Sequence, residues 1–147
     1  KATLFEGGIK VPCVMRWPGK IKPGSESDAM LSSLDLFPTF TGLAKARVDT
    51  LPLDGEDIAP VLFDGAQGTT RTLFWELGAH AELKRKPWTA VRQGDWKYLQ
   101  TPADGEHLFN LAKDPNETQN LAEREPARFR QLKELGQTLA KKMRQER

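Results

Sequence analysis

The first half of the chain alternates between apolar runs and loops rich in Gly, Pro and Ser. Residues 9–17 are almost continuously apolar, which is typical of a strand buried on both faces of a large sheet. Further on, an N-cap at Ser33 or Asp35 precedes apolar residues at helical spacing, and this pattern predicts a one-sided helix of about ten residues. Residues 57–63 predict at most a pair of short turns, ending at an Asp-Gly pair.

The second half has strand periodicity, followed by a helical pattern. Four short β-rich runs are separated by turn residues: 72–77, 89–92, 96–100 and 106–111. Between the second and third runs, Gln93-Gly94-Asp95 is a hairpin signal. The last stretch, residues 126–147, repeats apolar residues on one helical face: Phe129, Leu132, Leu135, Leu139 and Met143. An antiparallel sheet with one helix packed on it is therefore expected.

Taken together, these patterns predict an α/β fragment followed by an α+β subdomain. Residues 1–70 are interpreted as the last strand and helix of a large α/β domain, and residues 71–147 as an antiparallel sheet of about four strands with a C-terminal helix. The chain opens on Lys1, without an initiator Met, so we expect it to have been cut from a longer protein. Without its sheet partners the 9–17 strand would expose unpaired backbone groups, which predicts self-association there or poor order.

Composition excludes several classes of partner. The 22 basic and 20 acidic residues are mixed along most of the chain, so no broad electrostatic footprint for nucleic acid is visible. No apolar run approaches the roughly 20 residues that span a membrane. A single Cys cannot form an internal disulfide. We expect neither nucleic acid nor membrane as a partner, and the cellular compartment stays open.

Five short motifs occur in order along the chain. They are Glu6-Gly7-Gly8 with Trp17-Pro18-Gly19, Leu34-Asp35-Leu36-Phe37-Pro38-Thr39, Leu53-Asp54-Gly55-Glu56-Asp57, Arg92-Gln93-Gly94-Asp95-Trp96-Lys97, and Asp114-Pro115-Asn116-Glu117 with Asn120-Leu121. In this order they resemble the C-terminal portion of the sulfatases, an arylsulfatase-type family of the alkaline-phosphatase-like superfamily. Each motif is short, but the five together cover most of the chain.

The resemblance implies that the parent protein hydrolyses sulfate esters. Its nucleophile would be a formylglycine made from Cys or Ser, with Ca²⁺ bound beside it, and its substrate a sulfated small molecule or carbohydrate. The family takes its nucleophile, metal ligands and histidines from segments upstream of the matched region. Residues 1–70 would then be the end of the catalytic α/β domain. We expect no metal or cofactor in this chain and no activity from it alone, and a periplasmic or secreted parent is favoured.

Lys1 matches a family catalytic position, the lysine before Glu-Gly-Gly that contacts the substrate sulfate. As a compact point charge it suits a sulfuryl oxygen, and the alternative is a disordered terminal residue. Cys13 lacks the Pro of the family's Cys/Ser-x-Pro-x-Arg motif, so a small buried strand residue is favoured over a nucleophile. Glu6 and Lys10 are expected to form a structural polar network around the Gly-Gly turn rather than to do chemistry.

A second candidate site is the basic segment that ends in an aromatic residue, with His80, Lys84, Arg85 and Trp88 as substrate-binding candidates. It is either a solvated loop or a specificity lip, because loops on a rigid sheet carry binding residues and cations beside an aromatic suit an anionic sugar ring. His107, by contrast, is expected to be a half-exposed sheet residue.

Two further classes of function stay open. The chain could be a noncatalytic binding or packing module with the fold of a sulfatase tail. It could also come from a related phosphatase or phosphodiesterase, which shares the fold but uses another nucleophile and metal set. The upstream coding sequence discriminates between them: Cys/Ser-x-Pro-x-Arg indicates a sulfatase, and Thr or Ser with a two-zinc ligand set favours phosphoryl chemistry.

Overall fold

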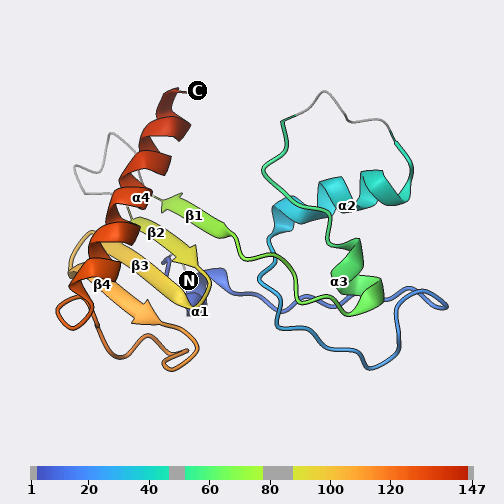
Figure 1. Cartoon of the computed structure of the whole chain (residues 1–147), viewed down its shortest axis with the longest axis horizontal. Coiled ribbons are helices and arrows are strands. Elements are labelled where there is room, and N and C mark those ends of the chain that lie inside the picture. The colour runs from blue at the N-terminus through green and yellow to red at the C-terminus, as the bar shows by residue number, and fades with distance from the viewer. Residues whose placement is uncertain (1–2, 47–51, 78–87, 146–147) are drawn as a thin grey trace. The chain divides into compact units, whose positions relative to one another are not determined.

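Strand periodicity and turn glycines set the architecture of the larger part of the chain. A computed structural model describes residues 3–46, 52–77 and 88–145. These residues form two compact units: residues 3–12 with 71–145, here called the sheet unit, and residues 13–70, here called the helical unit (Figure 1). Each unit is described by itself below.

The sheet unit contains four antiparallel strands paired in chain order, β1 (Thr72–Leu77), β2 (Trp88–Gln93), β3 (Trp96–Thr101) and β4 (Gly105–Asn110). Gly94 has a φ of 57°, which the tight turn between β2 and β3 requires and which a glycine adopts without steric cost. The predicted meander is therefore confirmed, with strand bounds within one residue of those expected.

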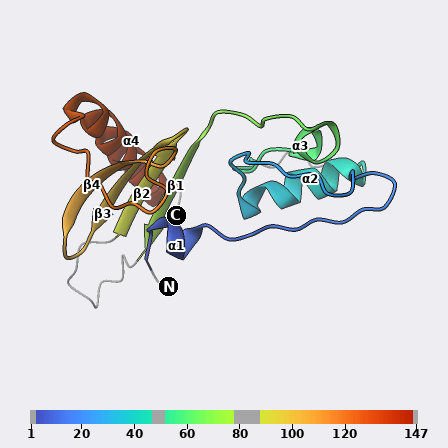
Figure 2. The ribbon, with the colours of Figure 1, turned by 90° about the horizontal axis from the view of Figure 1, so that it is seen from below.

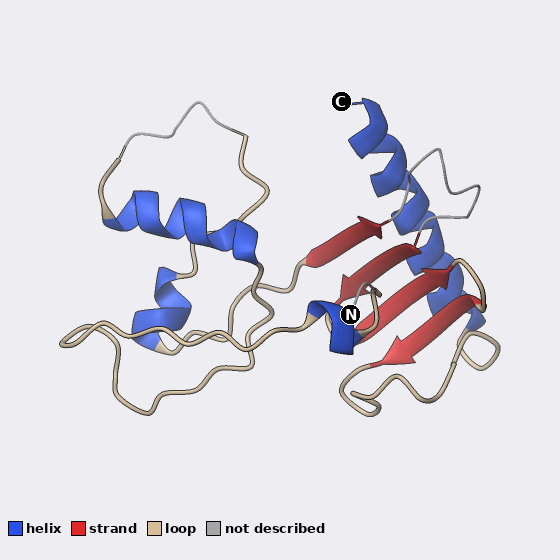
Figure 3. Ribbon diagram, turned by 180° about the vertical axis from the view of Figure 1, so that it is seen from behind, coloured by secondary structure: helices blue, strands red, loops and turns tan. Residues whose placement is uncertain are grey.

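The two faces of the sheet are covered by different segments. Val91, Tyr98 and Leu108 pack with Leu132 of the long helix α4 (Pro126–Gln145). The strand residues that point to the other face, including Ala90, Leu99 and Phe109, pack with Leu4, next to the short helix α1 (Glu6–Ile9). Figure 2 and Figure 3 show α1 and α4 on opposite sides of the strands. The period of two in the sequence thus divides the core into two layers.

Helix α4 lies close to the sheet because it carries a glycine at the point of contact. A Cβ atom on Gly136 would lie 2.9 Å from Cγ2 of Val91, so a larger residue would push the helix away. The predicted apolar face is buried at Leu132 and loses cover toward the C-terminus, where Met143 is exposed. The helix thus docks mainly through its first half.

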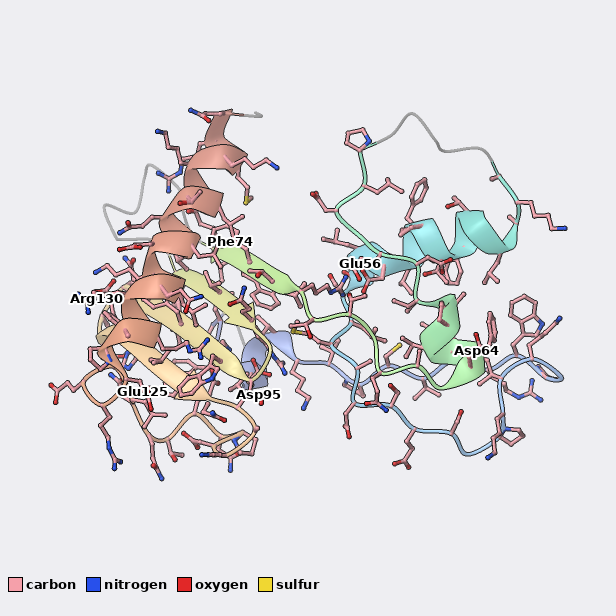
Figure 4. All side chains as sticks on the ribbon, in the orientation of Figure 1. Glu56, Asp64, Phe74, Asp95, Glu125 and Arg130 are labelled. Carbon is pink, nitrogen blue, oxygen red and sulfur yellow. The ribbon has the colours of Figure 1, made fainter. Side chains whose placement is uncertain are left out.

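Hydrogen bonds to buried polar side chains define the helical unit. A 3-10 turn (Ser33–Asp35) leads into α2 (Leu36–Leu43), and α3 (Ala59–Asp64) follows a loop. Asp35 accepts from the backbone N–H of Ser32 at 2.6 Å and from that of Glu56 at 3.0 Å. Figure 4 labels Glu56 beside the start of this helical segment. The helix prediction is confirmed, and Asp35 is the N-cap residue of α2, although the side-chain cap is made one turn earlier, by Ser32 at the start of the 3-10 turn.

Residues 9–17 differ from the sequence prediction. Ile9 ends α1, and residues 10–17 belong to neither helix nor strand. Val14 is 92% exposed and Cys13 is exposed as well, so the expected buried positions are wrong for both. A strand needs a neighbouring strand, and in the described ranges only β1 to β4 form a sheet. Self-association through this segment stays a prediction, which light scattering of Val14→Lys tests.

No helix in the described part of the chain is both long enough and apolar enough to cross a membrane.

Candidate functional site

Four charged side chains meet beneath α1, on the sheet face opposite α4. Glu6 opens α1, Arg92 and Lys97 are register partners on β2 and β3, and Glu117 lies in the turn after β4. These four residues are here called the ion cluster. Three of the motifs that resemble the sulfatases, those around Glu6, Lys97 and Glu117, therefore meet at one point.

Lys97 is the centre of the ion cluster. Its side chain is 0% exposed, and Nζ lies 2.9 Å from Oε1 of Glu6 and 2.8 Å from Oε1 of Glu117. The contact to Glu6 is a hydrogen bond, and the contact to Glu117 is an ion pair outside hydrogen-bond geometry. Arg92 approaches Glu6 less closely, with Nη1 3.4 Å from Oε2, and it is partly exposed.

Two positive and two negative side chains give the cluster a formal charge of zero. This balance matters because burying an unpaired ammonium group costs several kcal/mol. A buried pair is nevertheless weak evidence for stability, since apolar residues of the same volume often do as well. What the pairing adds is geometry: Lys97 accommodates two carboxylates from distant segments only when both segments are in place.

The turn that carries Glu117 is built by Asp114. Its carboxylate accepts from the backbone N–H of Gln119 at 2.8 Å and from the hydroxyl of Thr118 at 3.0 Å. The backbone hydrogen bond from Gln119 is the main reason that the pKa of Asp114 is lowered. Glu117 itself has a φ of 56°, in the left-handed region. The Asp-Pro-Asn-Glu motif thus has a structural task, which is to direct Glu117 toward Lys97.

Asn120 attaches the same turn to the sheet. Its Oδ1 accepts from the backbone N–H of Leu108 at 3.0 Å, and its Nδ2 donates to the carbonyl of Glu106 at 3.2 Å. The next residue, Leu121, donates its N–H to the carbonyl of Leu108 and packs against the core on the α4 face. The two ends of the motif therefore contact opposite faces of the sheet.

A second polar set lies on the α4 face. The hydroxyl of Tyr98 donates to Oε1 of Glu106 at 2.5 Å, and Nζ of Lys133 lies 2.7 Å from Oε2 of the same carboxylate. Burial, together with the neighbouring carboxylate, raises the pKa of Tyr98 well above its ordinary value. This set joins α4 to β4 on the sheet face opposite the ion cluster.

The sequence-predicted site residues fall into two groups. Lys1, His80, Lys84 and Arg85 lie outside the described residues, so their roles stay predictions. Trp88 is described: it is half-buried and packs edge-on against Phe5, with ring centroids 5.8 Å apart, on the α1 face. His107 is half-buried on β4 and stacks on Phe109, which fits the expected sheet role.

Sequence reasoning placed Glu6 in a structural network but chose the wrong partner. Lys10 is exposed, and Glu6 pairs instead with Lys97 and, through its backbone, with Glu117. One signal for Lys97 was available. Lys97 and Leu99 are two positions apart on β3 and therefore point to the same face of the sheet. The strand pattern thus placed a charged residue at a buried position.

The described ranges contain no group of three or more His, Cys, Asp or Glu side chains that could hold a metal ion. The ion cluster supplies only two carboxylates, and both are already paired with Lys97. It therefore does not fit a Ca²⁺ site, which takes six to eight oxygen ligands.

A meander with one packed helix carries these motifs, and known proteins share this arrangement. The family model described as "N-sulphoglucosamine sulphohydrolase, C-terminal" matches residues 1–147. Bovine (Bos taurus) arylsulfatase A is 35% identical over 143 residues, covering 82% of this chain and 28% of that protein. The chain belongs to the sulfatase family and is a C-terminal sulfatase portion.

Two further relatives support the assignment. The choline-sulfatase of Rhizobium meliloti is 36% identical over 125 residues, covering 84% of this chain and 23% of that enzyme. A solved structure from a glycosaminoglycan-metabolism locus of Bacteroides thetaiotaomicron superposes with a TM-score of 0.74 at 25% identity, covering 95% of this chain and 31% of that one. The chain thus spans between about a quarter and a third of the length of these relatives.

Proposed function

We propose that this chain is the C-terminal portion of an enzyme that hydrolyses sulfate esters. The observation that carries the proposal is the ion cluster, because it joins three segments whose motifs resemble those of sulfatases. Family membership over the whole chain supports the same reaction class. Within this proposal the sheet unit is a platform on which the segment before Glu6 is placed.

The chemistry divides between this chain and the rest of the enzyme. A sulfate monoester is an anion, so its hydrolysis needs a strong nucleophile, a Lewis acid on the sulfuryl oxygens and cations for the remaining charge. Lys1 would supply one of those cations. The nucleophile, a formylglycine, and the ligands of a Ca²⁺ ion would come from upstream residues. This chain alone is therefore expected to be inactive.

The proposed substrate is a sulfated small molecule or carbohydrate. The structural neighbour from a glycosaminoglycan-metabolism locus favours the carbohydrate. The segment with His80, Lys84 and Arg85 would contribute cations to its recognition, next to the aromatic Trp88. Trp88 packs on Phe5, on the face of the sheet that α1 covers. Its ring is therefore held on the same face as the ion cluster.

The coding sequence upstream of Lys1 provides the test. We expect it to encode Cys/Ser-x-Pro-x-Arg, and we expect the extended polypeptide, expressed with Ca²⁺ and a formylglycine-generating system, to hydrolyse an aryl sulfate. The chain of 147 residues is the matched control and should show no turnover above a heat-killed sample. If the upstream sequence encodes Thr or Ser with a two-zinc ligand set, the proposal is replaced by phosphoryl chemistry. If there is no coding sequence upstream of Lys1, a noncatalytic module is favoured.

A further inference from the structure

We propose that the ion cluster is a positioning device for the proposed sulfate-contacting lysine, with Lys97 and Glu117 as the residues that hold it. The inference rests on the proposed function, because it assigns a purpose to the segment that begins at Lys1. Lys1 precedes Glu6 by five positions in the sequence. Whatever fixes Glu6 therefore limits where that lysine can reach.

Glu6 is held through both its backbone and its side chain. Its backbone N–H donates to Oε2 of Glu117 at 2.5 Å, and its carboxylate accepts from Nζ of Lys97 at 2.9 Å. The N–H at the start of a helix has no partner inside the helix, so Glu117 supplies one that α1 lacks. Two points of attachment on one residue fix both the position and the direction of the chain there.

Helix α1 depends on this attachment. It has four residues, two of them glycines, and a helix this short is not stable by itself in water. A Cβ atom on Gly8 would overlap the carbonyl oxygen of Thr3, so the backbone before α1 folds back against the turn. The path of the chain from Thr3 to Ile9 is thus set by the fold, with Leu4 and Phe5 packed on the sheet and Glu6 on the ion cluster.

Lys97 acts through other residues and not on substrate. Its side chain is fully buried, so it cannot contact a substrate directly. Its partners come from segments 91 residues earlier and 20 residues later in the sequence, and neither partner lies on a strand of the meander. Apolar side chains could fill the space that the four charged side chains of the ion cluster occupy. A need to fix the position of α1 to a fraction of an ångström explains why charged side chains are present instead.

The first experiment measures whether the ion cluster holds α1, and it uses the 147-residue chain alone. Lys97→Met should increase hydrogen exchange of the amides at 6 and 8–10 by at least roughly tenfold relative to the β2 and β3 amides of the same variant, whose exchange reports the general loss of stability. Lys133→Met is the matched control, because it removes a lysine–glutamate pair from the other face of the sheet. If Lys97→Met unfolds the chain, Glu117→Gln repeats the test, since it keeps shape and removes only one charge. Unchanged exchange at α1 in the variant that folds overturns the proposal.

The second experiment measures whether this attachment serves Lys1, and it uses the extended polypeptide. Lys97→Met should lower kcat/KM for an aryl sulfate by roughly 100-fold, as expected for a small misplacement of a reacting group. In a Lys1→Ala background the same substitution should change kcat/KM by less than about threefold, because its effect passes through Lys1. A merely structural role would lower activity equally in both backgrounds, and that result overturns the proposal.

The two experiments separate two kinds of failure. If the extended polypeptide has no sulfatase activity, the proposed function and the role of Lys1 fall together. The exchange measurement then still decides whether the ion cluster holds α1.

Discussion

The sheet unit and the helical unit differ in how much of their buried interior is apolar. In the sheet unit the core is apolar, with Val91, Leu99 and Leu108 fully buried, and the buried charges are paired. In the helical unit Asp35 and Thr39 are 0% and 1% exposed, whereas Phe37 and Phe40 are about half exposed. Helix α2 therefore presents its apolar side outward and its polar side inward.

This difference shows two ways in which a motif can determine structure. In the sheet unit the motif residues add precision to a core that apolar packing already forms. In the helical unit buried apolar residues are few, Ile58 and Val61, and Asp35 and Thr39 hold residues 56–58 by hydrogen bonds. Gly55 lies where this loop approaches the 3-10 turn, and a Cβ atom there would overlap the carbonyl of Leu34. The sheet unit is thus the better candidate for independent stability.

The largest expected effect comes from breaking the charge balance of the ion cluster. Lys97→Met should destabilise the chain by about 3–5 kcal/mol, because two buried carboxylates lose their shared cation. The triple variant Glu6→Gln, Lys97→Met, Glu117→Gln should recover most of this loss. Chemical denaturation measures both, and a triple variant as unstable as Lys97→Met would show that the damage is one of shape and not of charge.

The next effect compares an apolar residue from each unit. Leu132→Ala should cost about 2–5 kcal/mol, because Leu132 is fully buried between α4 and the sheet. Phe40→Ala should cost less than about 0.5 kcal/mol, because Phe40 is 56% exposed. Denaturation midpoints of the two variants measure the contrast. Equal losses would mean that the α2 face is covered in solution.

A smaller effect tests the hydrogen-bonded centre of the helical unit. Asp35→Ala leaves the N–H groups of Ser32 and Glu56 without their carboxylate partner, which should cost about 1–3 kcal/mol locally. Limited proteolysis should then cut within residues 52–58, while exchange in β2 and β3 stays slow. Cleavage of the sheet unit at the same rate would contradict the separation of the two units.

The smallest effect concerns Tyr98, the chain's single tyrosine. Its raised pKa means that the unfolded chain ionises first, near pH 10, so the stabilisation is complete below pH 10 and declines as the pH rises above it. By pH 11 the loss should reach about 1.4 kcal/mol. Tyr98→Phe should remove this part of the pH dependence. Tyrosinate absorbance gives a direct check, and ionisation of the folded chain near pH 10 would refute it.

Local patterns predicted the sheet unit well, because each strand and α4 carries its own periodicity and turn residues. The 9–17 strand failed because strand formation depends on a neighbour that local sequence does not contain. The exposed apolar side of α2 was missed for a related reason: spacing indicates which residues share a face but not where that face points.

The candidate site was predictable only in part. The motifs identified Glu6 and its structural role, but its partners Lys97 and Glu117 lie 91 and 111 residues away in the sequence. Such pairings depend on how the whole sheet unit folds, and neither charge spacing nor periodicity encodes them. Lys97 could have been suspected, because a lysine at a buried strand position requires a partner.

The distance along the sequence between Glu6 and Glu117 also determines when the ion cluster can form during synthesis. A ribosome synthesises residues 3–9 before their partners on β3 and in the turn after β4, which appear up to 111 residues later. At about 5–20 residues per second the delay is roughly 6–22 s, during which Leu4, Phe5 and Ile9 have no sheet to cover them. Stalled nascent chains of increasing length should therefore stay protease-sensitive at residues 3–9 until Glu117 has left the exit tunnel.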